Sequence, residues 1–463
     1  MGWLSHDDQV YCLILVASFL ISSLVRTGHL PAWVAKNGGL VGFGMAVLII
    51  GWKVLYSVPL AFGTAVVIRL TAETKQKQMP MLIFISSFTY LIVCRCLHFI
   101  LPINELASHA NAVVLLMTLR VIGFAYDVFD SREHRFLRSD DPKKARRVIE
   151  EPQSVIEILN FFYHYCGLFT GPYYSYQMLE DSYVIVHLQG WSPSQEITKR
   201  FLTLAWSVPA FAILNAYFPL DGLRTDAVWD WSLVYRFFYA AAIFTVFRFR
   251  VYSAWAAAES VCLMVGIGMY PTASKAELIT GPKDLAVFKE LHGNADSPTS
   301  YDSEAMVNID MKEVEFSETF KYGIHGWNRS VQKWLALYVY QRLHNYKAQR
   351  TSITMFVSAL WHGTYAGYFM SFLLVPCCLA VEEMIRKRTD SIPNFKYLYI
   401  PTLRSRGFDF LAAGFLLKNF HDTVRFWGSL YFWLPLVLLG LFFALRATSK
   451  PNAGSRAVPT KRE

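Results

Sequence analysis

The sequence predicts an all-α, polytopic integral membrane protein. Of its 463 residues, 54% are hydrophobic and only 17% are charged, whereas soluble domains contain about 45–50% apolar and about 25% charged residues. The apolar residues gather in long runs between polar segments, which is the pattern of membrane-spanning helices. We expect about eleven transmembrane or re-entrant helices around an internal catalytic chamber, because helices satisfy their own backbone polar groups in lipid.

Eleven apolar segments lead to this expectation. The first, residues 10–25, lacks a basic n-region and a small-residue cleavage site, so we interpret it as a retained anchor and not as a signal peptide. Several of the others are short or contain Pro or Gly, and we expect these to be tilted, broken or re-entrant. The other ten segments are 38–55, 58–70, 79–101, 110–128, 201–220, 231–247, 252–270, 352–380, 408–420 and 429–445.

These segments predict a single membrane-embedded domain, residues 1–446. Within it, residues 272–318 form a polar, net acidic insert that is too long for a tight connection. The insert either folds over the site as a flap or remains a solvated loop. Residues 447–463 contain few apolar side chains, and we expect this tail to be disordered.

The formal net charge of +9 is spread over loops and includes no long basic block. In a membrane protein such an excess mainly sets the topology, and it also favours the approach of a polyanionic substrate from the cytosol. The seven cysteines lie mostly within apolar runs, so we interpret them as core residues and not as a disulfide framework. No histidine pair has the H-E-x-x-H spacing of a zinc site, and we predict no metal.

His362 is the first candidate for catalysis, because it lies inside the apolar run 352–380. Charged groups at membrane depth cost about 2.5–3.5 kcal/mol, so ionisable residues there usually have a function. On a continuous helix Ser358, His362 and Tyr365 share one face, while Trp361 points elsewhere, into packing. A neutral imidazole at this position can act as a general base. A histidine hydrogen-bonded inside the helix bundle fits the sequence equally well.

Asn328 is the second candidate and precedes His362 by 34 residues. An amide beside a base can orient the attacking hydroxyl or donate to a developing oxyanion, a role worth on the order of 10²–10³ in rate. Asn328 also begins the only N-x-[ST] sequon in the chain. Because Trp327 and other apolar residues flank it, we favour a buried role over glycosylation.

Two further polar clusters interrupt apolar sequence. Arg248, Arg250 and Glu259 either pair with one another or face a polar head group. The aromatic run 160–176 contains a Thr-Gly-Pro break at Thr170, which is typical of an unwound segment that lines a cavity. An aromatic belt at the membrane interface is the alternative.

Four stretches together resemble the membrane-bound O-acyltransferase family. They are Leu168-Phe169-Thr170-Gly171-Pro172-Tyr173-Tyr174, the segment 247–255, Trp327-Asn328 and Ser358-Ala359-Leu360-Trp361-His362-Gly363. The resemblance covers about residues 154–437 and implies His362 as the catalytic histidine with Asn328 as its partner. Around these two residues we expect the substrates to contact Trp327, Trp361, Ser358, Tyr365, Arg248 and Arg250.

The resemblance also implies the reaction. It is the transfer of a fatty acyl chain, polyunsaturated and arachidonoyl-like, from acyl-CoA to the sn-2 hydroxyl of a lysophospholipid during phospholipid remodelling. Within the family the similarity is to members that acylate lysophosphatidylinositol, in the endoplasmic reticulum membrane. It implies no cofactor besides acyl-CoA as co-substrate, and no nucleic acid partner.

Three other functions remain open at this point. The same reaction could take a choline, ethanolamine or serine lysophospholipid as acceptor. Other members of the family acylate secreted proteins or peptides. From a different class, the chain could be a transporter or channel with a buried, proton-carrying histidine, although it lacks obvious inverted repeats and a row of intramembrane carboxylates.

Overall fold

The structure is a computed structural model that describes residues 5–71, 78–102, 105–136, 149, 151–152, 154–188, 190–293, 300–389 and 400–447. The predicted tail, 447–463, lies outside the described residues except for its first position.

Helices form nearly all of the regular structure. The first half of the chain contains α1 (His6–Arg26), α2 (Trp33–Lys36), α3 (Gly38–Ile50), η1 (Gly51–Tyr56), α4 (Val58–Leu70), α5 (Met79–Ile100), α6 (Ser108–Phe136), α7 (Val155–Phe162), α8 (Tyr176–Ile185), α9 (Ser194–Tyr217), η2 (Leu220–Arg224) and η3 (Asp226–Asp230). The second half contains α10 (Leu233–Met264), α11 (Leu285–Gly293), α12 (Met311–Phe316), α13 (Phe320–His325), α14 (Arg329–Tyr338), η5 (Tyr340–Arg342), α15 (Arg350–His362), α16 (Ala366–Thr389), η6 (Ile400–Arg404), α18 (Ser405–Leu417), α19 (Phe420–Ser429) and α20 (Trp433–Ala447).

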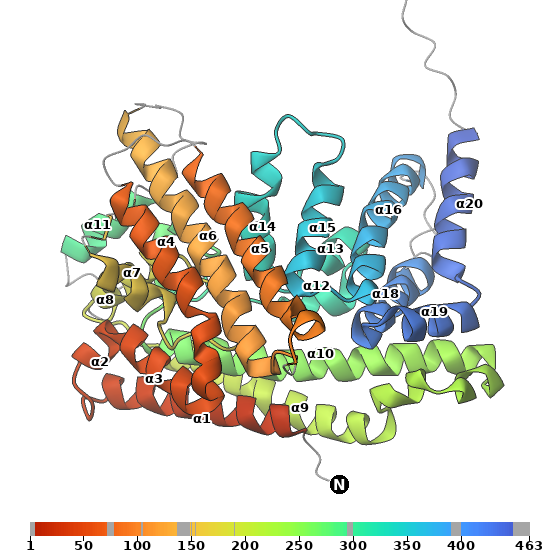
Figure 1. The fold of residues 1–463 in the computed structure, drawn as a ribbon, viewed down its shortest axis with the longest axis horizontal. Coiled ribbons are helices and arrows are strands. Elements are labelled where there is room, and N and C mark those ends of the chain that lie inside the picture. Colours follow the sequence, from red (N-terminus) through yellow and green to blue (C-terminus); the bar gives the residue numbers. More distant parts are fainter. Residues whose placement is uncertain are drawn as a thin grey trace, which may run out of the picture.

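The helices are arranged in two directions. The long helices α9 and α10 pack along each other across the base of Figure 1, with α1 against α10. Helices α5, α6, α14, α15, α16 and α20 rise steeply from that layer. This arrangement brings α6, α14 and α15, which are far apart in the sequence, over the middle of α10.

Helix α10 corrects one expectation from the sequence. Two spans, 231–247 and 252–270, were expected on either side of an arginine-containing break, but the structure has one continuous helix of 32 residues. The helix continues because Arg248 and Arg250 pair with carboxylates on other elements, Glu315 and Asp8. A charge that finds a partner does not need to end the helix that carries it.

The opposite correction applies to the expected span 352–380, which the structure divides into α15 and α16. Helix α15 ends at His362, and Gly363 is extended with φ 164° and ψ −175°. A Cβ atom on Gly363 would lie 2.7 Å from Cε2 of Tyr368, so this close approach favours glycine. Tyr365 follows the break and therefore does not share a helix face with Ser358 and His362, as the sequence had suggested.

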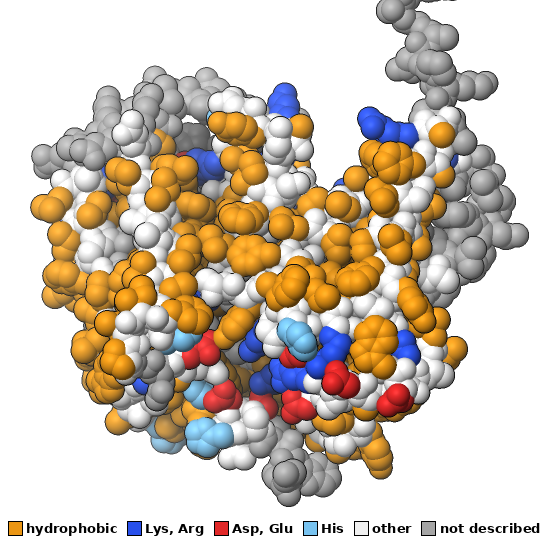
Figure 2. All heavy atoms as spheres, turned by 45° about the vertical axis from the view of Figure 1, so that its right-hand side comes forward, with side chains coloured by type: hydrophobic (Ala, Val, Ile, Leu, Met, Phe, Trp, Pro, Cys, Tyr) orange, Lys and Arg blue, Asp and Glu red, His pale blue; other side chains and the backbone are white. Residues whose placement is uncertain are grey.

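Membrane-spanning helices account for much of the fold. Among the described residues, six helices are long and apolar enough to cross a membrane, and the pair Phe420–Ser429 and Trp433–Ala447, bent by 67°, would make a seventh. The six are His6–Arg26, Gly38–Tyr56, Met79–Ile100, Ser108–Arg132, Ser194–Arg224 and Ala366–Arg388. Figure 2 shows hydrophobic side chains over most of one face, with charged side chains gathered in its lower part. The prediction of a polytopic helical membrane protein is confirmed.

The polar insert is packed against the bundle. It contains two short antiparallel pairs, β1 (Tyr270–Pro271) with β4 (Tyr301–Asp302) and β2 (Ala276–Glu277) with β3 (Gly281–Pro282), together with η4 (Thr272–Ser274), α11 and α12. Its residues Ile279, Ala305 and Met306 are buried in the main hydrophobic core. The described part of the insert is therefore packed into the domain and is not a solvated loop, and its residues Asn308 and Val314 line the cavities described below. All seven cysteines are free.

Candidate active site

Two cavities lie side by side among α5, α6, α10, α14, α15 and α18. The larger has a volume of about 780 Å³, and its wall includes the polar residues Arg95, Glu105, Ser108, Asn111, Thr170, Asn308, Thr364, Tyr365 and Lys418. The smaller has a volume of about 270 Å³ and is lined mainly by apolar and aromatic side chains, including Phe244, Phe247, Trp327, Met355, Phe372, Val375, Phe408, Leu411, Ala412 and Phe415. Four residues line both cavities: Trp255, Asn328, Val331 and His362.

His362 occupies the boundary between the cavities because it is the last residue of α15. Its half-buried ring packs on Trp361, Phe372 and Phe415, with centroid distances of 4.7, 5.1 and 5.1 Å. Within the described residues, neither ring nitrogen makes a hydrogen bond. The alternative of a histidine hydrogen-bonded inside the bundle therefore lacks a partner there, and the ring nitrogens are available to a ligand.

Asn328 comes from a different element, the N-cap of α14. Its backbone is left-handed, with φ 45° and ψ 52°, a conformation that Asn adopts more readily than most residues with a side chain. Its carboxamide does not cap the helix that follows. Its carboxamide makes no hydrogen bond among the described residues, so its donor and acceptor are available to a ligand in the cavities.

Asn308, from the insert, anchors the chain directly after Asn328. The Asn308 carboxamide oxygen accepts hydrogen bonds from the backbone N–H and the hydroxyl of Ser330, at 3.1 and 2.6 Å. The Asn308 carbonyl accepts from the Arg329 N–H at 2.8 Å. Because Asn308 is itself buried, these bonds fix the start of α14 relative to the insert.

A buried ion pair holds Asn308 in turn. The Asn308 N–H donates to the Glu259 carboxylate at 2.8 Å, and that carboxylate pairs with Arg200 at 3.0 Å. Arg200 also binds Glu196 at 2.6 Å and donates to the Ser303 hydroxyl at 2.8 Å. Helices α9 and α10 are thus tied through the insert to the segment that carries Asn328.

Four of the six expected substrate contacts line a cavity. Trp327 and Ser358 line the smaller one, and Trp361 and Tyr365 line the larger one. Trp361 also packs as expected, because its indole N–H donates to the Leu115 carbonyl at 3.1 Å.

Arg248 and Arg250 line neither cavity. Arg248 pairs with Glu315 at 2.9 Å, Arg250 pairs with Asp8, and Glu259 pairs with Arg200. The expectation that these three residues pair with one another is therefore wrong, because each pairs with a residue outside the cluster.

The aromatic run supplies part of the larger cavity. Residues 163–175 are not helical, and Thr170, Gly171 and Pro172 line that cavity, so the predicted unwound, cavity-lining segment is confirmed. Arg120 of α6 holds this segment. Its guanidinium donates to the carbonyls of Phe161, Phe162, His164 and Cys166 at 2.5–3.1 Å and to the Tyr174 hydroxyl at 3.2 Å.

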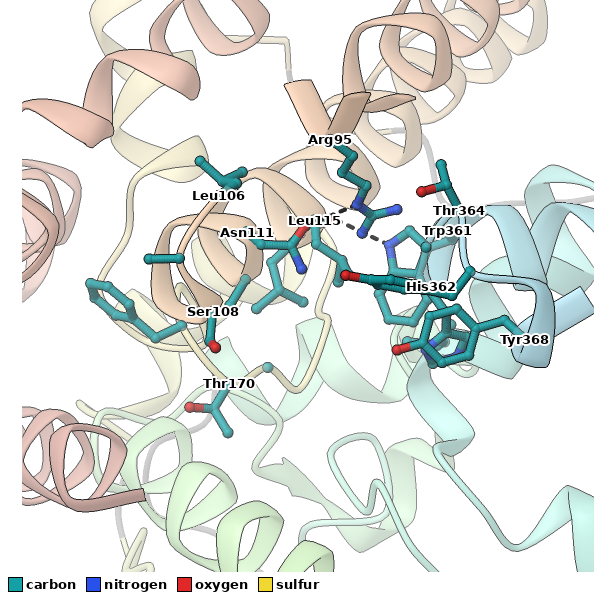
Figure 3. Close-up of a pocket in the computed structure, with 18 of the residues that line it drawn as sticks. Arg95, Leu106, Ser108, Asn111, Leu115, Thr170, Trp361, His362, Thr364 and Tyr368 are labelled. Atoms are coloured by element: carbon teal, nitrogen blue, oxygen red, sulfur yellow. Dashed lines mark hydrogen bonds between the residues drawn. The ribbon is translucent and has the colours of Figure 1, made fainter. Parts of the chain in front are cut away.

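Three residues that line or support the site were not expected from the sequence: Arg95, Arg120 and Asn308. Figure 3 shows Arg95 at the wall of the larger cavity, on the same side as His362. Both arginines lie inside predicted membrane spans, and an ionisable residue at such depth was the signal that could have found them. Nothing in the sequence marks Asn308.

Among the described residues no group of three or more His, Cys, Asp or Glu side chains could hold a metal ion.

The chain is similar to known proteins over nearly its whole length. The chain is 46% identical over 459 residues to the membrane-bound acylglycerophosphatidylinositol O-acyltransferase mboa-7 of Caenorhabditis briggsae, covering 98% of each chain. It is 45% identical to the protein of the same name from Caenorhabditis elegans, covering 99% of each. It is 31% identical to the human protein MBOAT7, covering 99% of this chain and 98% of the human one. Residues 44–414 match the membrane-bound O-acyltransferase family, and the chain belongs to that family.

Proposed function

We propose that the protein transfers a fatty acyl chain from acyl-CoA to the sn-2 hydroxyl of lysophosphatidylinositol in phospholipid remodelling. One observation carries the proposal: His362 and Asn328, from separate elements, both lie where a polar and an apolar cavity meet. The relatives, whose names specify acylglycerophosphatidylinositol O-acyltransferase, support the acceptor.

The chemistry at this boundary needs a base and a hydrogen-bonding group. The neutral His362 ring takes the proton from the sn-2 hydroxyl while its oxygen forms a bond to the thioester carbon. The carbon–sulfur bond then breaks, and the CoA thiolate leaves and takes the proton from His362, which returns the ring to its neutral form. General base catalysis of this kind contributes about 10²–10⁴ in rate. Asn328 orients the hydroxyl or donates to the thioester oxygen. No covalent acyl-enzyme is required.

The two cavities suit the two halves of the reaction. When an acyl chain enters the smaller cavity, its apolar surface is removed from water, which is favourable. The wall of this cavity includes Phe247, Phe372 and Phe415. A phosphoinositol head group needs polar partners, and the larger cavity offers Ser108, Asn111 and Glu105. Each substrate keeps its apolar and polar parts in matching surroundings.

Several finer features belong to this proposal. The donor chain is polyunsaturated and arachidonoyl-like, the membrane is that of the endoplasmic reticulum, and acyl-CoA approaches from the cytosol. The complete bundle contains about eleven transmembrane or re-entrant helices around the catalytic chamber. Among the described residues, the shorter apolar helix α4 adds one element to the six or seven long ones.

Acyl transfer by the purified protein tests the proposal. The protein in detergent receives one acyl-CoA and, in parallel, the inositol, choline, ethanolamine and serine lysophospholipids, and the products are measured by mass spectrometry. We expect the inositol product to dominate and His362→Ala to lose at least about 10²-fold in kcat. His421→Ala is the matched control, because its side chain is 81% exposed and lines neither cavity.

Other outcomes separate the rival functions. Preference for another lysophospholipid would reassign the acceptor but keep the chemistry. Acylation of an added protein or peptide without phospholipid product would move the activity to another branch of the family. A His362→Ala variant that acylates at the wild-type rate would remove the histidine from the mechanism.

A further inference from the structure

Arg95 is a buried cation whose charge is not balanced by a side chain. It belongs to α5, is 7% exposed and lines the larger cavity. Its Nε donates to the Asn111 carboxamide oxygen at 2.9 Å, and its Nη1 donates to the Leu360 carbonyl at 3.0 Å. Its Nη2 is buried and has no hydrogen-bond partner. Within the described part of the chain, Arg95 forms no ion pair.

Burial of an unpaired charge is unfavourable, and an ionisable residue at membrane depth is a candidate for a functional site. The Leu360 carbonyl, in the last turn of α15, contributes only the partial negative charge of a helix C-terminus. Of the described residues that line the larger cavity, Glu105 is the one carboxylate, and it accepts a hydrogen bond from the Tyr365 hydroxyl. An anionic ligand in the cavity would supply the missing counter-charge for Arg95 and an acceptor for its Nη2.

Both substrates carry phosphate groups. They differ in how far the nearest phosphate lies from the reacting group. In a lysophospholipid, the phosphate is esterified to the sn-3 carbon, which is bonded to the sn-2 carbon that carries the reacting hydroxyl. In acyl-CoA, the whole pantetheine arm separates the nearest phosphate from the thioester. Arg95 binds the carbonyl of Leu360, two residues before His362, so it lies beside the reacting position. This position fits the lysophospholipid phosphate.

A second cation stands at the exposed side of the same cavity. Lys418 follows α18, is exposed, and has its ammonium 6.0 Å from the centroid of the Tyr365 ring. It makes no ion pair among the described residues. We infer that Arg95, with Lys418 at the exposed side, binds the phosphodiester of the lysophospholipid acceptor in the larger cavity and so places its sn-2 hydroxyl against His362. This inference rests on the proposed function.

Steady-state kinetics with both substrates varied test the inference. Arg95→Gln removes the charge, and we expect KM for lysophosphatidylinositol to rise roughly 10- to 100-fold, which corresponds to one lost charge-assisted hydrogen bond. KM for acyl-CoA should stay within about twofold, and Arg95→Lys should fall between the wild type and Arg95→Gln. Arg386→Gln is the matched control, because Arg386 is exposed and lines neither cavity.

A variant at the exposed side keeps the test decisive if Arg95→Gln does not fold. Lys418→Met should raise KM for the acceptor by about two- to fivefold, as expected for a solvent-exposed charge. A rise in KM for acyl-CoA in place of the acceptor would assign the cations to the CoA phosphates and overturn the inference. A fall in kcat with both KM values unchanged would also overturn it, because Arg95 would then act only on His362.

Failure of the proposed function gives a different result. If the wild type acylates lysophosphatidylcholine and not the inositol lipid, the acceptor is wrong. The same KM comparison still applies to that lipid, because every lysophospholipid carries the phosphodiester.

Discussion

The side chain of Asn308 accepts two hydrogen bonds from Ser330, one from its backbone N–H at 3.1 Å and one from its hydroxyl at 2.6 Å. Ser330 follows Asn328 by two positions, so the insert controls where the candidate catalytic amide stands. The positions of His362 and Asn328 thus depend on different supports: the end of α15 for one, and the insert for the other.

Asn308→Ala tests this support. The substitution leaves the buried N–H and hydroxyl of Ser330 without their acceptor, which costs about 1–3 kcal/mol. We expect kcat to fall at least about tenfold, because small displacements at a reacting centre are expensive, while KM for either substrate changes little. Asn345→Ala is the control, since Asn345 is exposed, makes no hydrogen bond among the described residues and lines neither cavity. Unchanged kcat in Asn308→Ala would show that Asn328 does not need this anchor.

The left-handed backbone of Asn328 makes glycine the informative replacement. Asn328→Gly removes the carboxamide without strain, because glycine adopts positive φ readily. We expect kcat to fall by about 10²–10³ with an unchanged melting temperature. Asn328→Ala should lose the same activity and also about 1 kcal/mol of stability, because alanine is strained at this φ. Full activity in the glycine variant would reduce Asn328 to a residue of the turn.

Acyl-chain preference should follow the volume of the smaller cavity. Ala412 of α18 lines it, and Ala412→Phe would occupy part of its 270 Å³. We expect kcat/KM for an arachidonoyl donor to fall at least about tenfold relative to a short acyl-CoA, since a hydrophobic pocket distinguishes chains by about 1–3 kcal/mol per methylene. Ala17→Phe, on the exposed face of α1, serves as the control. An unchanged ratio would place the donor chain elsewhere.

Arg120 should matter for stability more than for binding. It is 2% exposed and lines neither cavity. Arg120→Leu leaves several buried carbonyls of residues 161–166 unpaired, and we expect a loss of more than about 3 kcal/mol, read as a lower melting temperature in detergent. Arg120→Lys should recover only part of this, because an ammonium cannot match the guanidinium fork. A melting temperature equal to that of the exposed Arg386→Leu variant would contradict this role.

The sequence predicted the class of the fold but not every boundary. Apolar runs reveal helices through composition, and the helical, membrane-embedded chain was expected on that basis. The division between 231–247 and 252–270 was wrong because the partners of Arg248 and Arg250 come from distant elements. The break after His362 was missed because the apolar run continues through it, and only the packing of Gly363 against Tyr368 marks it.

The site was predictable where single residues were unusual for their surroundings. His362 drew attention as an ionisable residue in an apolar run, and the same reasoning applied to Arg95 would have found a third member. Asn308 could not be found, because a polar residue in a polar insert has nothing to distinguish it. Its importance arises only from its contacts with Glu259 and Ser330, which lie 49 and 22 positions away.

Because Trp255, Asn328, Val331 and His362 face both cavities, the donor and the acceptor can occupy separate compartments until the thioester and the alcohol touch. Either lipid can then dissociate while the other stays bound. Such an arrangement predicts turnover through a ternary complex with no fixed order of addition, and it lets one catalytic pair serve chains of different length and saturation.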